Sequence, residues 1–305
     1  MKKALSVLLC VCLALGCLPF AALAAAIGDT NASGDVTAED ARAILRAAVG
    51  LDELTGEALL AADVNTDGEV TAEDARLALR TAVGLELAAP QVFENQYDIL
   101  RSGFFCAELD GGADVGMTLA ARGDDQWILT SMDGIDFSVL VREDSVYLLD
   151  APHRVYAAFD AAATEFLGED ALDMNDIMQE ARSFADFSAL PPLDDAAFTQ
   201  EAPIDGVPTT AYLFPDADGY IKINMDGPRI RAFSRIDSRG RTLETLRFAS
   251  VRAVLPAEPF SAPETYLQIP DLMTYMLIAF AGALGVEGIT EADIQEMIEE
   301  AKQAA

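Results

Sequence analysis

Two short stretches of the sequence bring carboxylate, amide and hydroxyl groups together in a spacing that suits calcium. They run Asp29-Thr30-Asn31-Ala32-Ser33-Gly34 and Asp63-Val64-Asn65-Thr66-Asp67-Gly68. Calcium takes about six to eight hard oxygen ligands, and a loop of about twelve residues supplies them from alternate positions, with glycine at the sharp turn. Such clusters also form plain turns, but two copies in the same register favour metal binding.

The calcium-loop spacing assigns each residue a role. The predicted ligands are Asp29, Asn31, Ser33, Asp35 (through its carbonyl), Thr37 (through water) and Asp40 in the first loop, and Asp63, Asn65, Asp67, Glu69 (carbonyl), Thr71 and Asp74 in the second. We therefore predict two bound Ca²⁺ ions. The second loop should bind its ion more tightly, because Asp67 adds a carboxylate where the first loop has only Ser33.

A helix is predicted to follow each loop. Residues 36–51 read VTAEDARAILRAAVGL, and residues 70–85 read VTAEDARLALRTAVGL. The apolar residues fall at helical spacing, and Gly50 and Gly84 stand where helices commonly end. We expect no helix before either loop.

Residues 28–86 resemble a type I dockerin, and we assign residues 27–87 to a small all-α domain of the double EF-hand-like kind. The resemblance rests on Asp at the last loop position, on the absent leading helix and on the duplication. It implies a cohesin-like scaffold protein as partner. The positions that match the partner-binding residues of the family are Ala38, Glu39, Arg42, Arg46, Ala72, Glu73, Arg76 and Arg80.

This sequence departs from the family pattern at several of those positions. Alanine and glutamate replace the common serine or threonine at the loop ends, and Leu45 and Leu79 replace one residue of each basic pair. The cohesin type is therefore open, and a calcium-stabilised stalk without a partner is an alternative. The near-identity of the copies predicts two interchangeable binding faces.

The N-terminus and the composition indicate export. Residues 1–26 are predicted to be a signal peptide, with Lys2 and Lys3 before a long apolar run and Ala22-Leu23-Ala24 at its end. Leu15-Gly16-Cys17 loosely resembles a lipobox, so a lipid anchor at Cys17 is an alternative. The chain carries 51 acidic and 20 basic residues, which argues against nucleic acid as a ligand. We expect a secreted or cell-surface protein.

A larger second domain is predicted over residues 88–305, after a break at Leu87-Ala88-Ala89-Pro90. Alternating apolar residues separated by turn sequences indicate about six strands between residues 99 and 159 and about five between 197 and 254. Helices are expected at about 161–185, 271–284 and 290–303. This order predicts an α+β domain with a highly curved antiparallel sheet, or half-barrel, and helices.

Residues 91–265 are similar in pattern to the LolA/LppX family of lipoprotein carriers. The segment from Ser145 to Tyr156 carries most of this resemblance. It implies a half-open barrel that shelters a lipid or another apolar ligand. A β-rich scaffold for adhesion or assembly is the alternative.

The sequence marks no catalytic set. His153 is the only histidine and is expected at the surface at the start of a strand, while Cys106 between apolar neighbours is expected in the core. Trp127 is the only tryptophan, whereas sugar-binding clefts usually stack several aromatic rings. We predict a non-catalytic assembly protein. The alternative is a cellulosome-type component of polysaccharide catabolism, associated with glycoside hydrolases that cleave O-glycosyl bonds.

Two further patterns yield expectations. Eight basic residues between Lys222 and Arg252 could form a positive stripe that receives phosphate groups or the acidic first domain, although a solvated face is the simpler interpretation. The uncharged segment 272–286 is too short to span a membrane comfortably. We expect it to lie as a helix against the concave side of the sheet.

Overall fold

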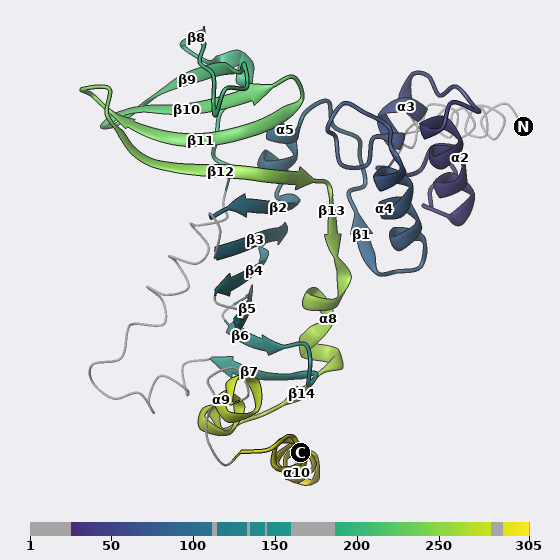
Figure 1. Ribbon diagram of the computed structural model, residues 1–305, viewed down its shortest axis with the longest axis vertical. Coiled ribbons are helices and arrows are strands. Elements are labelled where there is room, and N and C mark those ends of the chain that lie inside the picture. The colour runs from purple at the N-terminus through teal and green to yellow at the C-terminus, as the bar shows by residue number, and fades with distance from the viewer. Residues whose placement is uncertain are drawn as a thin grey trace, which may run out of the picture.

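The computed structural model describes residues 26–111, 115–132, 135–143, 145–159, 187–281 and 289–304. The predicted signal peptide, its Cys17 and the helix expected at 161–185 lie outside the described residues. The first domain contains the helices α2 (Ala38–Ala48), α3 (Glu57–Ala62) and α4 (Ala72–Ala82). Figure 1 shows α2 and α4 side by side at one side of the molecule.

The sequence around each long helix explains where it starts and stops. Thr37 caps α2 through its side chain, and Asp40 bonds back to the Thr37 amide, which completes a capping box. Thr71 and Asp74 do the same for α4. Gly50 and Gly84, just beyond the helix ends, have left-handed φ angles of 72° and 75°. The predicted helices and stops are confirmed.

The short helix α3 corrects one expectation. The sequence pattern predicts no helix before either loop, yet α3 leads directly into the second loop. Its sequence, EALLAA, consists of strong helix formers. Ala61 and Ala62 are buried in the first domain, so packing stabilises a helix too short to persist alone.

The second domain is built on one open twelve-stranded sheet (Figure 1). The spatial order is β14-β7-β6-β5-β4-β3-β2-β12-β11-β10-β9-β8. The strands are β2 (Phe104–Asp110), β3 (Val115–Arg122), β4 (Asp125–Met132), β5 (Ile135–Arg142), β6 (Ser145–Asp150), β7 (Val155–Phe159), β8 (Phe198–Glu201), β9 (Thr210–Asp216), β10 (Gly219–Asp226), β11 (Arg229–Asp237), β12 (Thr242–Arg252) and β14 (Leu267–Gln268). All neighbours are antiparallel except β14 with β7. The six strands and the five strands that the sequence predicts are confirmed.

The two faces of the sheet bury different side chains because neighbours along a strand point to opposite sides. One face carries Phe105 and Leu119, which pack with Phe187 in the largest core cluster. The other carries Cys106 and Trp127, which pack under helix α8 (Ala257–Thr265). The predicted core position of Cys106 is confirmed, since its side chain has no exposed surface.

Two helices close the described chain. Helix α9 (Leu272–Phe280) packs on Val155 at the end of the sheet, and its Phe280 stacks on Phe137 with ring centroids 5.0 Å apart. Helix α10 (Glu291–Ala304) packs against α9 through Ile294. Both helices agree with the sequence prediction, and α9 lies against the sheet. In the described part of the chain no helix is both long and apolar enough to cross a membrane.

The junction between the two domains is itself a small sheet. Residues Glu86–Ala88 form β1, which pairs antiparallel with β13 (Val254–Pro256) of the second domain. The helix α5 (Gln96–Arg101) follows, and its Tyr97 is completely buried. One continuous cluster of buried residues joins Leu77 of the first domain to Tyr97 of the second. The two domains therefore share a core across the predicted break.

Candidate functional site

The first loop is organised by two buried carboxylates. Asp29, which is 1% exposed, accepts hydrogen bonds from the Ser33 and Gly34 amides at 3.0 and 2.8 Å. Asp40, which is fully buried, accepts from the Thr30 amide at 3.1 Å and the Thr37 amide at 3.0 Å. The carboxylates at the first and last loop positions are therefore both held by backbone amides of the same loop.

The second loop repeats this arrangement. Asp63 accepts hydrogen bonds from the Asp67 and Gly68 amides at 3.0 and 2.8 Å. Asp74 accepts from the Asn65 amide at 3.2 Å and the Thr71 amide at 2.8 Å. The third position adds a contact, because the Asn65 side-chain oxygen accepts from the Asp67 amide at 3.0 Å.

The backbone of both loops adopts the conformation that such a turn requires. Gly34 and Gly68 have φ angles of 97° and 91°, and the residues two places earlier, Ala32 and Thr66, have φ angles of 53° and 51°. Left-handed conformations are costly for residues with a Cβ. Because these conformations recur at the same two positions of both loops, the two loops share one backbone geometry.

The donor set of both loops fits a hard cation such as calcium. All the predicted side-chain ligands offer oxygen, and the carboxylates of Asp29, Asp40 and Asp74 are buried without an arginine or lysine partner in the described ranges. Buried carboxylates need compensating charge. Among the residues that the structure describes, no three acidic, histidine or cysteine side chains form a preformed metal cluster. The loop amides hold the carboxylates instead.

Burial raises the pKa of two acids in the second loop. The pKa of Asp63 rises to about 6, mainly because the side chain is removed from water, with a smaller contribution from the charges of Asp74 and Asp67. The pKa of Asp74 also rises for the same main reason. Raised carboxyl pKa values mark a place where negative charge is crowded and poorly solvated.

The candidate partner-binding residues lie on the helices that follow the loops. On α2, Arg42 faces Glu39 at 4.0 Å, and Arg46 binds Asp52 at 2.6 Å. These four side chains are between 43% and 75% exposed. Leu45 is 45% exposed beside them. The first copy thus presents an apolar side chain among charged groups.

The second copy makes ion pairs from the matching arginines, but one of its acidic partners is buried. Arg76 binds Glu73 at 2.5 Å, and Arg80 binds Glu86 at 2.9 Å. Glu86 is only 5% exposed because it belongs to β1. The structure places Ala38 and Ala72 at the matching first positions of α2 and α4.

The second loop also contacts the second domain, which sequence reasoning suggested only in general terms. Arg229 of β11 donates from Nε to the Asp67 carbonyl at 2.9 Å and reaches the Asp67 carboxylate at 3.0 Å. Gln96 donates to the Asn65 carbonyl at 3.1 Å. Most other arginines of the expected stripe pair with acids of the second domain, as in Arg231–Asp226, Arg235–Asp216, Arg241–Asp237, Arg247–Asp205 and Arg252–Glu108.

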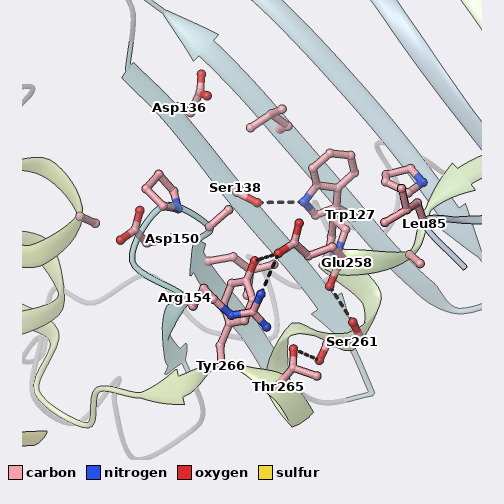
Figure 2. Close-up of a pocket in the computed structure, with 18 of the residues that line it drawn as sticks. Leu85, Trp127, Asp136, Ser138, Asp150, Arg154, Glu258, Ser261, Thr265 and Tyr266 are labelled. Atoms are coloured by element: carbon pink, nitrogen blue, oxygen red, sulfur yellow. Dashed lines mark hydrogen bonds and ion pairs between the residues drawn. The ribbon is translucent and has the colours of Figure 1, made fainter. Parts of the chain in front are cut away.

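A cavity of about 760 Å³ lies where the Trp127 face of β4–β6 meets α8 and α9 (Figure 2). Its apolar walls include Trp127, Leu129 and Leu149. Trp127 donates from its ring nitrogen to the Ser138 hydroxyl at 2.8 Å. Sequence reasoning missed this cavity because α8, which forms one wall, contains Pro263 and carries no helical pattern.

Charged groups gather at one side of this cavity. Glu258 accepts from the Tyr266 hydroxyl at 2.8 Å and lies 3.6 Å from Arg154, whose guanidinium also stacks 5.1 Å from the Tyr266 ring centroid. Figure 2 shows these three side chains converging. Burial and, to a smaller extent, the hydrogen bond to Glu258 raise the pKa of Tyr266. The cavity therefore combines an apolar wall with a fixed polar side.

The remaining reactive side chains have structural partners. His153 lies in the turn before β7, partly buried, with its Nδ1 2.6 Å from Asp150. It is less exposed than the sequence suggests, because the turn folds it onto that carboxylate. Burial raises the pKa of the Cys106 thiol to about 12. Neither group forms a nucleophile and base pair in the described residues.

Comparisons with known proteins agree with the first domain. Residues 27–79 match the model of the dockerin type I domain, which confirms the resemblance seen in the sequence. No curated protein matches the chain in sequence.

Solved structures are similar to this chain only at a low level. An uncharacterized conserved protein from Thermus thermophilus is 8% identical with a TM-score of 0.29, over 58% of this chain and 97% of that one. MucB in complex with MucA(peri) is 12% identical with a TM-score of 0.26, over 51% and 52%. The Pseudomonas aeruginosa MucA/MucB complex is 12% identical with a TM-score of 0.27, over 53% and 56%. Scores this low carry no argument about the second domain.

Proposed function

We propose that residues 27–87 form a calcium-dependent docking module that attaches the second domain to a cohesin-type scaffold outside the cell. The observation that carries this proposal is the repeated closure of each loop by its first and last carboxylates. Dockerin type I domains dock to cohesins in cellulosome-type assemblies, and residues 27–79 match that domain. The secreted or cell-surface location follows from the same role.

Two calcium ions would be held by the two loops. Asp29, Asn31, Ser33, the Asp35 carbonyl and Asp40 would hold one ion, and Asp63, Asn65, Asp67, the Glu69 carbonyl and Asp74 the other. When bound, each ion supplies the positive charge that the buried carboxylates require. The residues themselves fix the start of α2 and α4, because Asp40 and Asp74 also complete the capping boxes.

The loss of calcium should therefore loosen the helices that carry the partner-binding residues. Repulsion between the carboxylates in each loop returns when the ion leaves, and binding energy of the ion is folding energy for the module. Docking is then calcium-dependent without any direct contact between ion and partner.

A binding assay with the full chain tests the docking role. The immobilised protein should capture a type I cohesin in calcium and release it in EGTA. Asp29→Ala combined with Asp63→Ala should abolish capture. Asp35→Ala is the matched control, because that position contributes only its backbone carbonyl, and it should retain capture. Failure of the unaltered protein to bind any of several cohesins, or equal binding in EGTA, would contradict the proposal.

For the second domain we propose a non-catalytic role in binding an apolar or amphipathic small molecule, such as a lipid. The cavity beneath α8 supports this role, because its size and its mixture of apolar walls and few polar groups are typical of ligand sites. A part in polysaccharide catabolism would come through the assembly to which the module docks.

Trp127 reports on this cavity directly, because it is the only tryptophan of the chain. Palmitate added to the protein should shift its fluorescence. Ala279→Arg, at the cavity wall, should remove that shift. Met273→Arg, on the same helix but 59% exposed, should leave it unchanged. An unchanged spectrum in the unaltered protein at saturating palmitate would exclude this ligand class.

A further inference from the structure

The second calcium loop rests on the turn between β10 and β11. Besides the two Arg229 contacts to Asp67, Gln96 links both partners, since it donates to the Asn65 carbonyl at 3.1 Å and accepts from the Ile230 amide at 3.3 Å. Gly68 approaches the turn so closely that an added Cβ would lie 2.9 Å from the Pro228 ring. Gly68 and Pro228 are therefore in close contact.

The start of α4 faces the same part of the second domain. Glu73 and Arg76 line a cavity of about 360 Å³ whose other walls include Arg229 and Arg252. The side chains of Glu73 and Arg76 are 47% and 55% exposed. Their counterparts on α2, Glu39 and Arg42, are 75% and 73% exposed.

A partner protein would meet these two copies differently. Stable interfaces cover about 800 Å² on each side. A footprint of that size centred on Glu73 and Arg76 would overlap Arg229 and Arg252, which line the same cavity. The matching footprint on α2 meets open surface around Glu39, Arg42 and Leu45.

We propose that the two copies have divided their roles: the second loop anchors the module's own second domain through Arg229, and the scaffold partner docks on the α2 face alone. The proposal rests on the docking function proposed above and adds which surface performs it. It replaces the two interchangeable faces expected from the repeat. The occupant of the α2 face is a cohesin-type protein whose contact patch accepts an apolar side chain between charged groups.

The chemistry explains why only the second loop is anchored. Asp67 offers a carboxylate to Arg229, whereas the first loop has Ser33 at the same position. The Ser33 hydroxyl donates to the Asp35 carbonyl within the loop at 3.1 Å. An arginine placed beside the first loop would find no carboxylate at that position.

Matched double variants of the full chain test the proposal in calcium. Ala38→Arg with Arg42→Glu should weaken cohesin binding by about 100-fold or more, equivalent to about 2.7 kcal/mol. Ala72→Arg with Arg76→Glu should change it by about twofold or less. If the two doubles bind equally well and only their combination fails, the docking function stands and the division of roles is wrong.

The anchor has a test that needs no partner. In Arg229→Ala, amides of residues 63–71 should exchange with deuterium about tenfold faster in calcium, while those of residues 29–37 keep their rate. Arg231→Ala is the control, because Arg231 pairs with Asp226 of the neighbouring strand, and it should leave both loops unchanged. Unchanged exchange in Arg229→Ala would overturn the anchor even if docking itself is confirmed.

Discussion

The two calcium loops share nearly one sequence, yet they have different surroundings. Both close through their first and last carboxylates and both lead into a capped helix. The second also lies against the second domain, where Arg229 and Gln96 contact it. The comparison teaches that the repeated residues determine the local turn, whereas residues far along the chain determine what each turn contacts.

Calcium removal should produce the largest difference between the two copies. In EGTA, α2 should lose most of its protection from hydrogen exchange, because its loop carboxylates repel one another and Arg229 pairs with the second loop instead. Helix α4 should retain part of its protection, since β1 and the β10–β11 turn hold it from outside. Exchange measured by mass spectrometry on the intact protein checks this. Equal loss in both helices would break the comparison.

The ion pair between Arg80 and the buried Glu86 predicts a difference in stability between the copies. Arg80→Ala leaves the buried Glu86 carboxylate without its partner and should lower the free energy of unfolding by about 2 kcal/mol. Arg46→Ala removes the matching pair with Asp52, which is exposed, and should leave stability unchanged. Urea unfolding in calcium measures both. A similar cost for the two variants would show that β1 does not distinguish the copies.

Arg229 also bears on the calcium affinity of the second loop. Asp67 predicts tighter binding there than in the first loop, but the guanidinium 3.0 Å from its carboxylate opposes a second cation. Arg229→Ala should therefore strengthen calcium binding at the second loop about fivefold, roughly 1 kcal/mol. Titration calorimetry resolves the two sites. Weaker binding in the variant would mean that the anchor preorganises the loop more than it repels the ion.

The labelling rate of the Cys106 thiol should show the smallest of these effects. Burial raises its pKa to about 12, so in the native protein at pH 8 almost no thiolate forms and labelling by iodoacetamide should be barely detectable. Cys106 packs with Leu255 of β13 beneath the junction. Calcium removal should raise the labelling rate only severalfold, through brief opening of that junction. Labelling as fast as in urea would show that the second domain depends on calcium throughout.

The sequence predicts those features that depend on near neighbours. The loops, the helices that follow them, the stops at Gly50 and Gly84 and the strands of each hairpin all follow from short patterns. Turn chemistry such as Asp216-Ala-Asp-Gly219 correctly marks the hairpin between β9 and β10.

The features that the sequence does not reveal depend on distant pairing. Nothing in residues 86–88 indicates that they pair with residues 254–256. The helix α8 contains two prolines and carries no helical pattern, and it forms where its residues pack over Cys106 and Trp127. Arg229 is one of many arginines in its region, and only the register of β10 with β11 brings it to the turn that meets Asp67. The basic stripe is nevertheless a useful signal, because one of its members does receive the acidic first domain.

The pairing of β1 with β13 has a consequence for the order in which the molecule becomes complete during synthesis. The docking module is made early, but Glu86 must wait for Pro256 before its strand has a partner. Until then, Glu86 lacks the cover that buries it, and the strands β2 to β12 must emerge first. A nascent chain that stops short of residue 254 would carry both calcium loops, but its β1 would have no partner strand. The pairing of β13 with β1 therefore acts as a closing step, which joins the first domain to the second.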